Sequence, residues 1–110
     1  MSIETMSTET IGEKLRNIRE EKELPLRKVA ALLDIDVAIL SKMERGERRI
    51  TKEVVLKLSE IYCCNADDLL VTLLSDRILY EIRNEELGEK ALKVTEKRIK
   101  YLTQLENFGL

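Results

Sequence analysis

The sequence predicts an all-α protein in which five short helices lie between residues 10 and about 75 and further helical segments follow. Three observations support this fold class. Apolar residues recur three or four positions apart, which is the spacing of helices with one buried face, and no strand-like alternation is seen. Residues that cap helix ends precede several of these stretches. The 110 residues include one proline and four glycines, so long irregular loops are not expected.

The first helix is expected from about Ile11 to Lys22. Thr10 and Glu13 have the spacing of a capping box, in which the threonine oxygen and the glutamate carboxylate each accept a hydrogen bond from the other residue's backbone amide. Apolar residues then follow at helical spacing as far as Ile18. Pro25 cannot continue this helix and separates it from the next.

The second and third helices are separated by a turn of three residues. The second begins at about Leu26, and the turn is Asp34-Ile35-Asp36. Asp36 is placed to cap a third helix over residues 37–45, and Gly46 would end it in the left-handed conformation. A tight turn of this kind fixes the angle between two helices, so that the second projects outward in a helix-turn-helix arrangement.

The fourth and fifth helices follow without a long loop. Thr51 is placed to cap the fourth helix, which has apolar residues on one face from Val54 to Tyr62. Asn65 with Asp68 would cap the fifth, which begins at Ala66.

The length fits one domain with a small appendage. Residues 1–9 lack both the basic start and the apolar core of an export signal, and they are expected to form a disordered lead-in. Residues 10–75 would form the helix-turn-helix domain and residues 76–110 a C-terminal helical extension. No apolar run approaches the roughly 20 residues needed to cross a bilayer, so we expect a cytoplasmic protein with no membrane partner.

The chain contains no recognisable catalytic or metal-binding constellation. It has no histidine and no glycine-rich phosphate loop, and its carboxylates alternate with lysine and arginine as on solvated helix faces. Cys63 and Cys64 are adjacent, and a vicinal disulfide would be strained. We interpret both thiols as small buried apolar residues in a reducing cytoplasm. We therefore expect no enzyme activity, no cofactor, no metal and no small-molecule ligand.

Positive charge gathers at the end of the third helix and just after it. Residues 42–52 contain five basic and two acidic residues, whereas the whole chain has a net charge of −2. A basic patch on an otherwise acidic chain is typical of polyanion binding. The alternative is a solvated face that has no partner. The basic residues are Lys42, Arg45, Arg48, Arg49 and Lys52.

The segment from Ile11 to Leu70 resembles the Cro/CI-type (XRE) helix-turn-helix regulators of phages and bacteria. The resemblance is carried by IGEKLRNIREEKEL, VAALLDIDVAILSKMERGER and KLSEIYCCNADDLL, and by the family's Ser-x-x-Glu-x-Gly pattern at Ser41, Glu44 and Gly46. It implies a five-helix, lambda-repressor-like domain that binds double-stranded DNA. A generic helical bundle is the alternative, but such a bundle has no need of the short turn followed by clustered arginines.

The third helix would then lie in the major groove. By position and by the resemblance, the residues that face base edges are Val37, Ala38, Ser41 and Lys42. Val37 and Ala38 can touch a thymine methyl group but cannot form bidentate hydrogen bonds, which leaves Ser41 and Lys42 for polar readout. The expected phosphate contacts are made by Arg45, Arg48, Arg49, Lys52, the amides of the helix start at Thr51, and Arg27 and Lys28 early in the second helix.

The sequence departs from the family pattern in two places. Leu26 stands where the family often has a glutamine that contacts DNA, and Asp34 replaces the usual turn glycine. Part of the specificity could therefore come from Arg48 and Arg49 or from DNA shape. The resemblance also implies that Arg19 and Glu44 form a structural ion pair that orients the third helix.

The C-terminal third is more apolar than a small domain needs. A polar break at residues 83–86 precedes a last helix from about Leu87 to Leu105, which has apolar residues on one half. Dimerisation through this region is preferred, because a helix-turn-helix reader gains affinity by binding two half-sites. Folding back onto the same domain and binding to a membrane surface are the alternatives. The expected dimer contacts are Leu73, Leu74, Ile78, Ile82, Leu92, Ile99, Leu102 and Leu105.

The sequence thus predicts a transcriptional regulator that binds specific double-stranded DNA as a homodimer, on an operator with two-fold symmetric half-sites. The compact form with a helical C-terminus resembles controller proteins of restriction-modification systems and regulators that accompany DNA methyltransferases. An antitoxin, a phage-type repressor, or a protein-interaction module that has kept the fold without DNA binding are the alternatives. The operator and the sign of regulation stay open.

Overall fold

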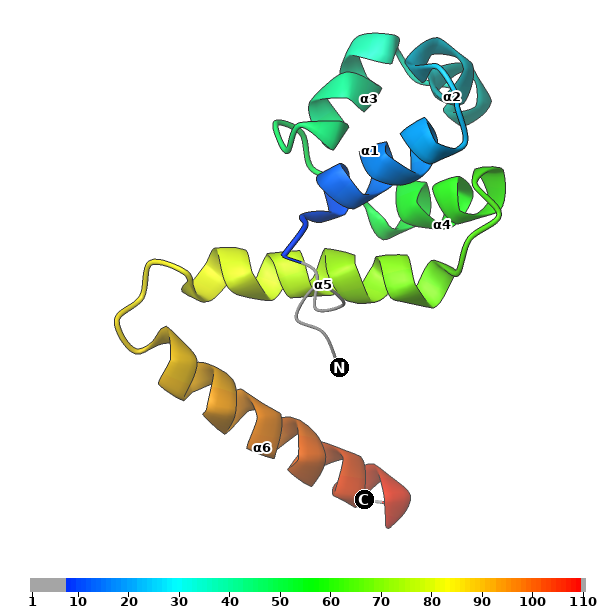
Figure 1. Cartoon of the computed structure of the whole chain (residues 1–110). Helices are drawn as coiled ribbons and strands as arrows, with labels where there is room; N and C mark the ends of the chain where they lie inside the picture. The colour runs from blue at the N-terminus through cyan, green and yellow to red at the C-terminus, as the bar shows by residue number, and fades with distance from the viewer. Residues whose placement is uncertain (1–7, 110) are drawn as a thin grey trace. The chain divides into compact units, whose positions relative to one another are not determined.

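The computed structural model describes residues 8–109 (Figure 1). Within that range the chain forms six helices and no strand, which confirms the predicted all-α class. They are α1 (Ile11–Glu21), α2 (Leu26–Leu33), α3 (Val37–Glu44), α4 (Lys52–Ile61), α5 (Ala66–Ile82) and α6 (Gly88–Asn107). Of the expected disordered lead-in, residues 1–7 lie outside the described range. None of the six helices is long and apolar enough to cross a membrane.

The chain divides into two units, the first ending at Asp76 and the second beginning at Arg77. The first unit holds α1 to α4 and the larger part of α5, and the second holds the end of α5 and all of α6. The assignment of these parts to DNA binding and to dimerisation stays a prediction.

The hydrophobic core of the first unit receives side chains from each of its five helices. In the view of Figure 1, α1 runs through the middle of this unit, with α2 and α3 on one side and α4 and α5 on the other. Burying these side chains is the main stabilising contribution to the fold. The core residues are Ile11, Leu15, Val29, Ala30, Leu33, Leu40, Met43, Ile50, Val55, Leu58, Tyr62, Leu69 and Leu73.

Three of the predicted helix caps are confirmed. Thr10 and Glu13 form the capping box, Thr51 Oγ1 accepts a hydrogen bond from the amide of Val54, and Asn65 Oδ1 accepts one from Asp68. Asp36 occupies the expected N-cap position of α3, and its carbonyl accepts hydrogen bonds from the amides of Ile39 and Leu40. Its side chain, however, makes no capping hydrogen bond.

The turn between α2 and α3 depends on a left-handed residue. Asp34 has φ 57° and ψ 47°, and its amide bonds back to carbonyls of α2. Aspartate is among the residues that tolerate this conformation best after glycine, so it can take the place of the usual turn glycine. Gly46 ends α3 with φ 76°, as expected.

The fifth helix is longer than expected. It continues past residue 75 to Ile82, because no glycine or proline interrupts the apolar segment before the polar break. The predicted dimer contact at Leu73 is wrong. Its side chain is 3 % exposed and belongs to the core of the first unit, so it is not available to a second chain. Leu74 and Ile78 are exposed, and Ile82 is half-buried.

The second unit contains a tight corner between the end of α5 and the start of α6. Gly88 is buried there, and a Cβ atom at this position would lie 2.6 Å from the carbonyl oxygen of Ile82. Only glycine therefore allows this approach. Along α6, Ile99 and Leu102 are 57 % and 56 % exposed, whereas Leu92 and Leu105 are half-buried.

Candidate nucleic-acid interface

Helix α3 has one face in the core and one face open to solvent. Leu40, Met43 and Glu44 are buried, because α3 packs against α1 and α2. The opposite face carries the four residues that the sequence predicts to meet base edges. Val37, Ala38 and Lys42 are exposed and Ser41 is half-buried.

The basic residues that follow α3 lie on a short anchored loop. The amide of Glu47 bonds to the carbonyl of Lys42 at 2.8 Å, and Ile50 is buried in the core, so both ends of the loop are fixed. Arg48 and Arg49 are exposed between these two anchors. The loop therefore presents two guanidinium groups from a backbone that is held in place.

One of the cations near α3 has an acidic neighbour. Arg45 Nε lies 3.0 Å from Glu47 Oε2, and both side chains are about half exposed. An ion pair in such a position contributes little free energy, about 0–1 kcal/mol, so a phosphate group could replace the glutamate.

The start of α4 adds backbone donors to this region. Thr51 accepts the hydrogen bond of one amide of the first turn, and Lys52 is exposed beside it. The remaining amides of a helix start carry partial positive charge and attract anions. Arg27 and Lys28 are exposed in the first turn of α2, the helix before the turn.

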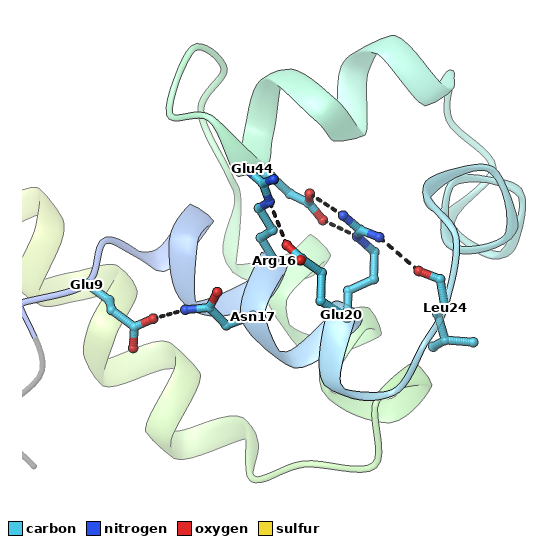
Figure 2. A network of polar contacts seen from close by, with 7 residues as sticks. Glu9, Arg16, Asn17, Glu20, Leu24 and Glu44 are labelled. Carbon is cyan, nitrogen blue, oxygen red and sulfur yellow. Dashed lines mark hydrogen bonds and ion pairs between the residues drawn. The ribbon is translucent and has the colours of Figure 1, made fainter.

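An almost buried ion pair holds the C-terminal end of α3 (Figure 2). Arg19 Nε lies 2.7 Å from Glu44 Oε2 and Arg19 Nη2 lies 3.1 Å from Oε1, so the contact is bidentate. A third nitrogen of the same guanidinium donates to the carbonyl of Leu24 at 2.8 Å. The hydrogen bond to Glu44 raises the pKa of Arg19. The pair therefore joins α3 to α1 and to the loop before α2.

A tyrosine hydroxyl lies buried within the electrostatic reach of this pair. Tyr62 is fully buried, and in the described part of the chain its hydroxyl has no hydrogen-bond partner. Burial, and to a lesser degree the negative charge of Glu44, raises the pKa of Tyr62. The tyrosine is therefore a structural group that stays protonated.

Gly12 is a structural position that the sequence did not reveal. A Cβ atom there would lie 2.5 Å from the carbonyl oxygen of Met43 and 2.7 Å from that of Glu44. The absence of a side chain thus lets α1 approach the end of α3. The available signal was a glycine inside a helical pattern, which costs about 1 kcal/mol relative to alanine and needs a reason.

The described residues hold no cluster of three or more histidine, cysteine or acidic side chains that could bind a metal ion. Both cysteines are free thiols. The expectation that both are buried is wrong for Cys63, which is exposed because it lies in the turn after α4 with φ 53°. Cys64 is half-buried, and burial raises the pKa of its thiol.

Comparison with known proteins gives similarities of three kinds: to a family model, to a curated protein and to a solved structure. A family model described as helix-turn-helix matches residues 15–69, which is half of the chain. The HTH-type transcriptional regulator DdrOP3 of Deinococcus deserti is 36 % identical over 58 residues, which make up 53 % of this chain and 45 % of that protein. The matched region thus spans less than half the length of this relative. The crystal structure of the clp gene regulator ClgR from Corynebacterium glutamicum has a TM-score of 0.53 at 20 % identity, covering 87 % of this chain and 88 % of that one, which shows a shared fold.

Proposed function

The chain belongs to the XRE-type helix-turn-helix family, and on this basis we propose that it is a transcriptional regulator that binds specific sequences of double-stranded DNA. The observation that carries the proposal is the arrangement around α3. Its inner face is fixed in the core, its outer face is open, and exposed arginines follow on an anchored loop. We also propose that the protein acts in the cytoplasm.

In the proposed complex α3 lies in the major groove. Ser41 and Lys42 can donate hydrogen bonds to base edges, and Val37 and Ala38 can pack against thymine methyl groups. Because two of the four base-facing residues of α3 are apolar, fewer hydrogen bonds are available to distinguish one base pair from another. DNA shape would therefore contribute to the choice of operator.

Phosphate contacts would supply most of the affinity. The groups proposed to donate hydrogen bonds to phosphates come both before and after α3 in the sequence. They are Arg45, Arg48, Arg49, Lys52 and the amides at the start of α4 after Thr51, with Arg27 and Lys28 at the start of α2. Contacts of this kind fix the register of the protein on the duplex without reading bases.

We further propose that the protein binds as a homodimer on two-fold symmetric half-sites. Ile99 and Leu102 leave apolar surface in contact with water on α6, and Leu74 and Ile78 do so on α5. Burying such surface against a second copy is favourable, and it doubles the DNA contacts. The remaining proposed contacts are Ile82, Leu92 and Leu105. Control of an operon for a restriction-modification system or a DNA methyltransferase is the proposed role.

The test is a titration of the protein into a labelled duplex from the region upstream of its own gene, over a range of salt concentrations. Changing both Arg48 and Arg49 to alanine should weaken binding and make the logarithmic salt slope about 3.6 units shallower for the proposed dimer. Each protomer loses two phosphate contacts, and each lost contact removes about 0.9. The matched control changes Lys97 and Lys100 to alanine, which removes the same charge from exposed positions of α6.

The control variant should bind with the same slope as the unchanged protein. If the unchanged protein does not bind DNA, or binds it without dependence on salt, the protein-interaction module is the better reading. This alternative is favoured by three residues that offer no polar contact to a base: Leu26, Val37 and Ala38.

A further inference from the structure

The first turn of α1 is joined to the middle of α5 by a long-range hydrogen bond. The amide of Ile11 donates to Asp76 Oδ2 at 2.7 Å, although the two residues are 65 positions apart. A helix start has unpaired amides and partial positive charge, so a carboxylate is favoured there. One turn further on, Lys14 Nζ donates to Thr72 Oγ1 at 3.3 Å. Two side chains of α5 therefore hold α1.

The same turn of α1 contacts the C-terminal end of α3, the helix proposed to read the DNA bases. Gly12 follows Ile11 directly and lies against the last carbonyl groups of α3, at Met43 and Glu44. These neighbours are backbone atoms, which cannot rotate away as a side chain can. A displacement of this turn of α1 relative to α5 would therefore move α3 as well.

Helix α5 has two opposite faces within the first unit. Leu69, Thr72, Leu73 and Asp76 are spaced as one side of a helix, and they carry the core contacts and the bonds to α1. Val71 and Leu74 fall on the opposite side and are 67 % and 41 % exposed. We call this opposite side the outer face of α5.

We infer that Asp76 is a positioning residue that fixes α3 relative to the outer face of α5 and thereby sets the half-site spacing that a dimer accepts. The inference rests on the proposed dimeric DNA binding, in which the outer face of α5 contacts the partner. Two reading helices must lie about 34–36 Å apart to reach successive major grooves, whereas one base pair adds about 3.4 Å. Loosening the connection between α5 and α3 would therefore relax the choice of spacing.

The experiment first obtains a binding site by selection from random-sequence duplexes with the unchanged protein. Affinities are then measured for the full site, for a half-site in which the other half is scrambled, and for full sites with one base pair added or removed. Changing Asp76 to alanine should leave half-site binding nearly unchanged. It should lower the ratio of full-site to half-site affinity, and the preference for the selected spacing, by roughly fivefold or more.

Two further variants separate positioning from stability. Asp76→Asn keeps an oxygen that can accept the Ile11 hydrogen bond, so it should retain most of the full-site preference. Glu13→Ala removes the hydrogen bond that the Thr10 amide donates to the Glu13 carboxylate. This bond lies at the same end of α1 but does not involve α5. The Glu13→Ala variant should lower the urea midpoint as a lost cap does, yet keep the wild-type ratio of affinities.

The outcomes distinguish the inference from the function on which it rests. If the unchanged protein binds no duplex, or prefers the full site no more than the half-site, the proposed dimeric function fails and the inference falls with it. If the unchanged protein shows the preference and Asp76→Ala keeps it, or Glu13→Ala loses it equally, the inference alone is overturned. Should Asp76→Ala not fold at the assay temperature, Asp76→Glu replaces it. The longer side chain should change the preferred spacing, and an unchanged preference would count against the inference.

Discussion

Arg19 and Glu44 make a bidentate ion pair across 25 positions of sequence, with side chains that are only 11 % and 5 % exposed. The guanidinium also donates to the carbonyl of Leu24, so its nitrogens find partners on α3 and on the loop before α2. Neither residue points to solvent, where DNA would bind. The pair is thus part of the support that fixes the end of α3.

Breaking this pair from one side should be more harmful than removing it completely. Glu44→Leu leaves the guanidinium of Arg19 without its partner, and we expect a loss of about 3 kcal/mol in the free energy of unfolding. The double change of Arg19 to methionine and Glu44 to leucine should lose less than the sum of its single changes, because no charge is left unpaired. Urea unfolding of the unchanged protein, the two single variants (Arg19→Met and Glu44→Leu) and the double variant measures the coupling energy between the two side chains. Additive losses would show that the two side chains do not depend on each other.

Gly12→Ala should destabilise the protein although alanine is the better helix former. The gain in helix propensity is about 1 kcal/mol. Against it stands a methyl group placed within 2.7 Å of two backbone oxygens, and overpacking of this kind costs about 1–3 kcal/mol. We expect a net loss in the free energy of unfolding and weaker DNA binding, because α3 must shift. A variant that is more stable than the unchanged protein would mean that α1 does not approach α3 this closely.

The local features of this fold could be predicted from the sequence, because they depend on residues a few positions apart. The capping box at Thr10, the cap at Thr51 and the left-handed Gly46 are of this kind. Leu73 shows the limit of such reasoning. Leu73 and Leu74 are equally apolar, and spacing alone does not say which one faces the core and which one faces outward.

Contacts between distant positions were harder to predict. Asp76 and Gly12 have their roles only because their partners, 65 and more than 30 positions away, are brought close by folding. The Arg19–Glu44 pair was expected, but only through the family resemblance. Nothing in either residue's own neighbourhood in the sequence predicts the other as its partner.

Tyr62→Phe should leave the protein at least as stable near neutral pH. The buried hydroxyl has no hydrogen-bond partner among the described residues, so its removal relieves a desolvation cost of about 1 kcal/mol or more. Thermal or urea unfolding at pH 7 measures this. A clear loss of stability in the phenylalanine variant would show that the hydroxyl is hydrogen-bonded after all.

The same substitution should change the dependence of stability on alkaline pH. Because burial raises the pKa of Tyr62 in the folded protein, the unfolded chain loses this proton first, at about pH 10. Above that pH the folded state binds more protons than the unfolded state, so stability falls as pH rises. The Tyr62→Phe variant should lack this component. Urea midpoints between pH 8 and 11 compare the two proteins, and parallel curves would contradict the prediction.

Placing glutamate at both Ile99 and Leu102 should convert the proposed dimer into a monomer that is still folded. Both side chains are more than half exposed in the single chain, so the change costs the monomer little. In a two-fold symmetric interface each substitution acts twice. Losing the burial of these side chains, at about 1.5–3 kcal/mol each, should raise the dimer dissociation constant more than a hundredfold.

Sedimentation at micromolar concentration measures this dissociation, and Lys97→Glu with Lys100→Glu on α6 provides the control with two added acids at exposed positions. The control should stay dimeric, because lysines on the polar half of α6 are not expected in the interface. The alternative, in which the apolar half of α6 covers its own chain, makes a different prediction. There the Ile99 and Leu102 variant would unfold at lower urea concentration while its mass stays that of the unchanged protein, because the glutamates would disturb a contact within one chain rather than between two.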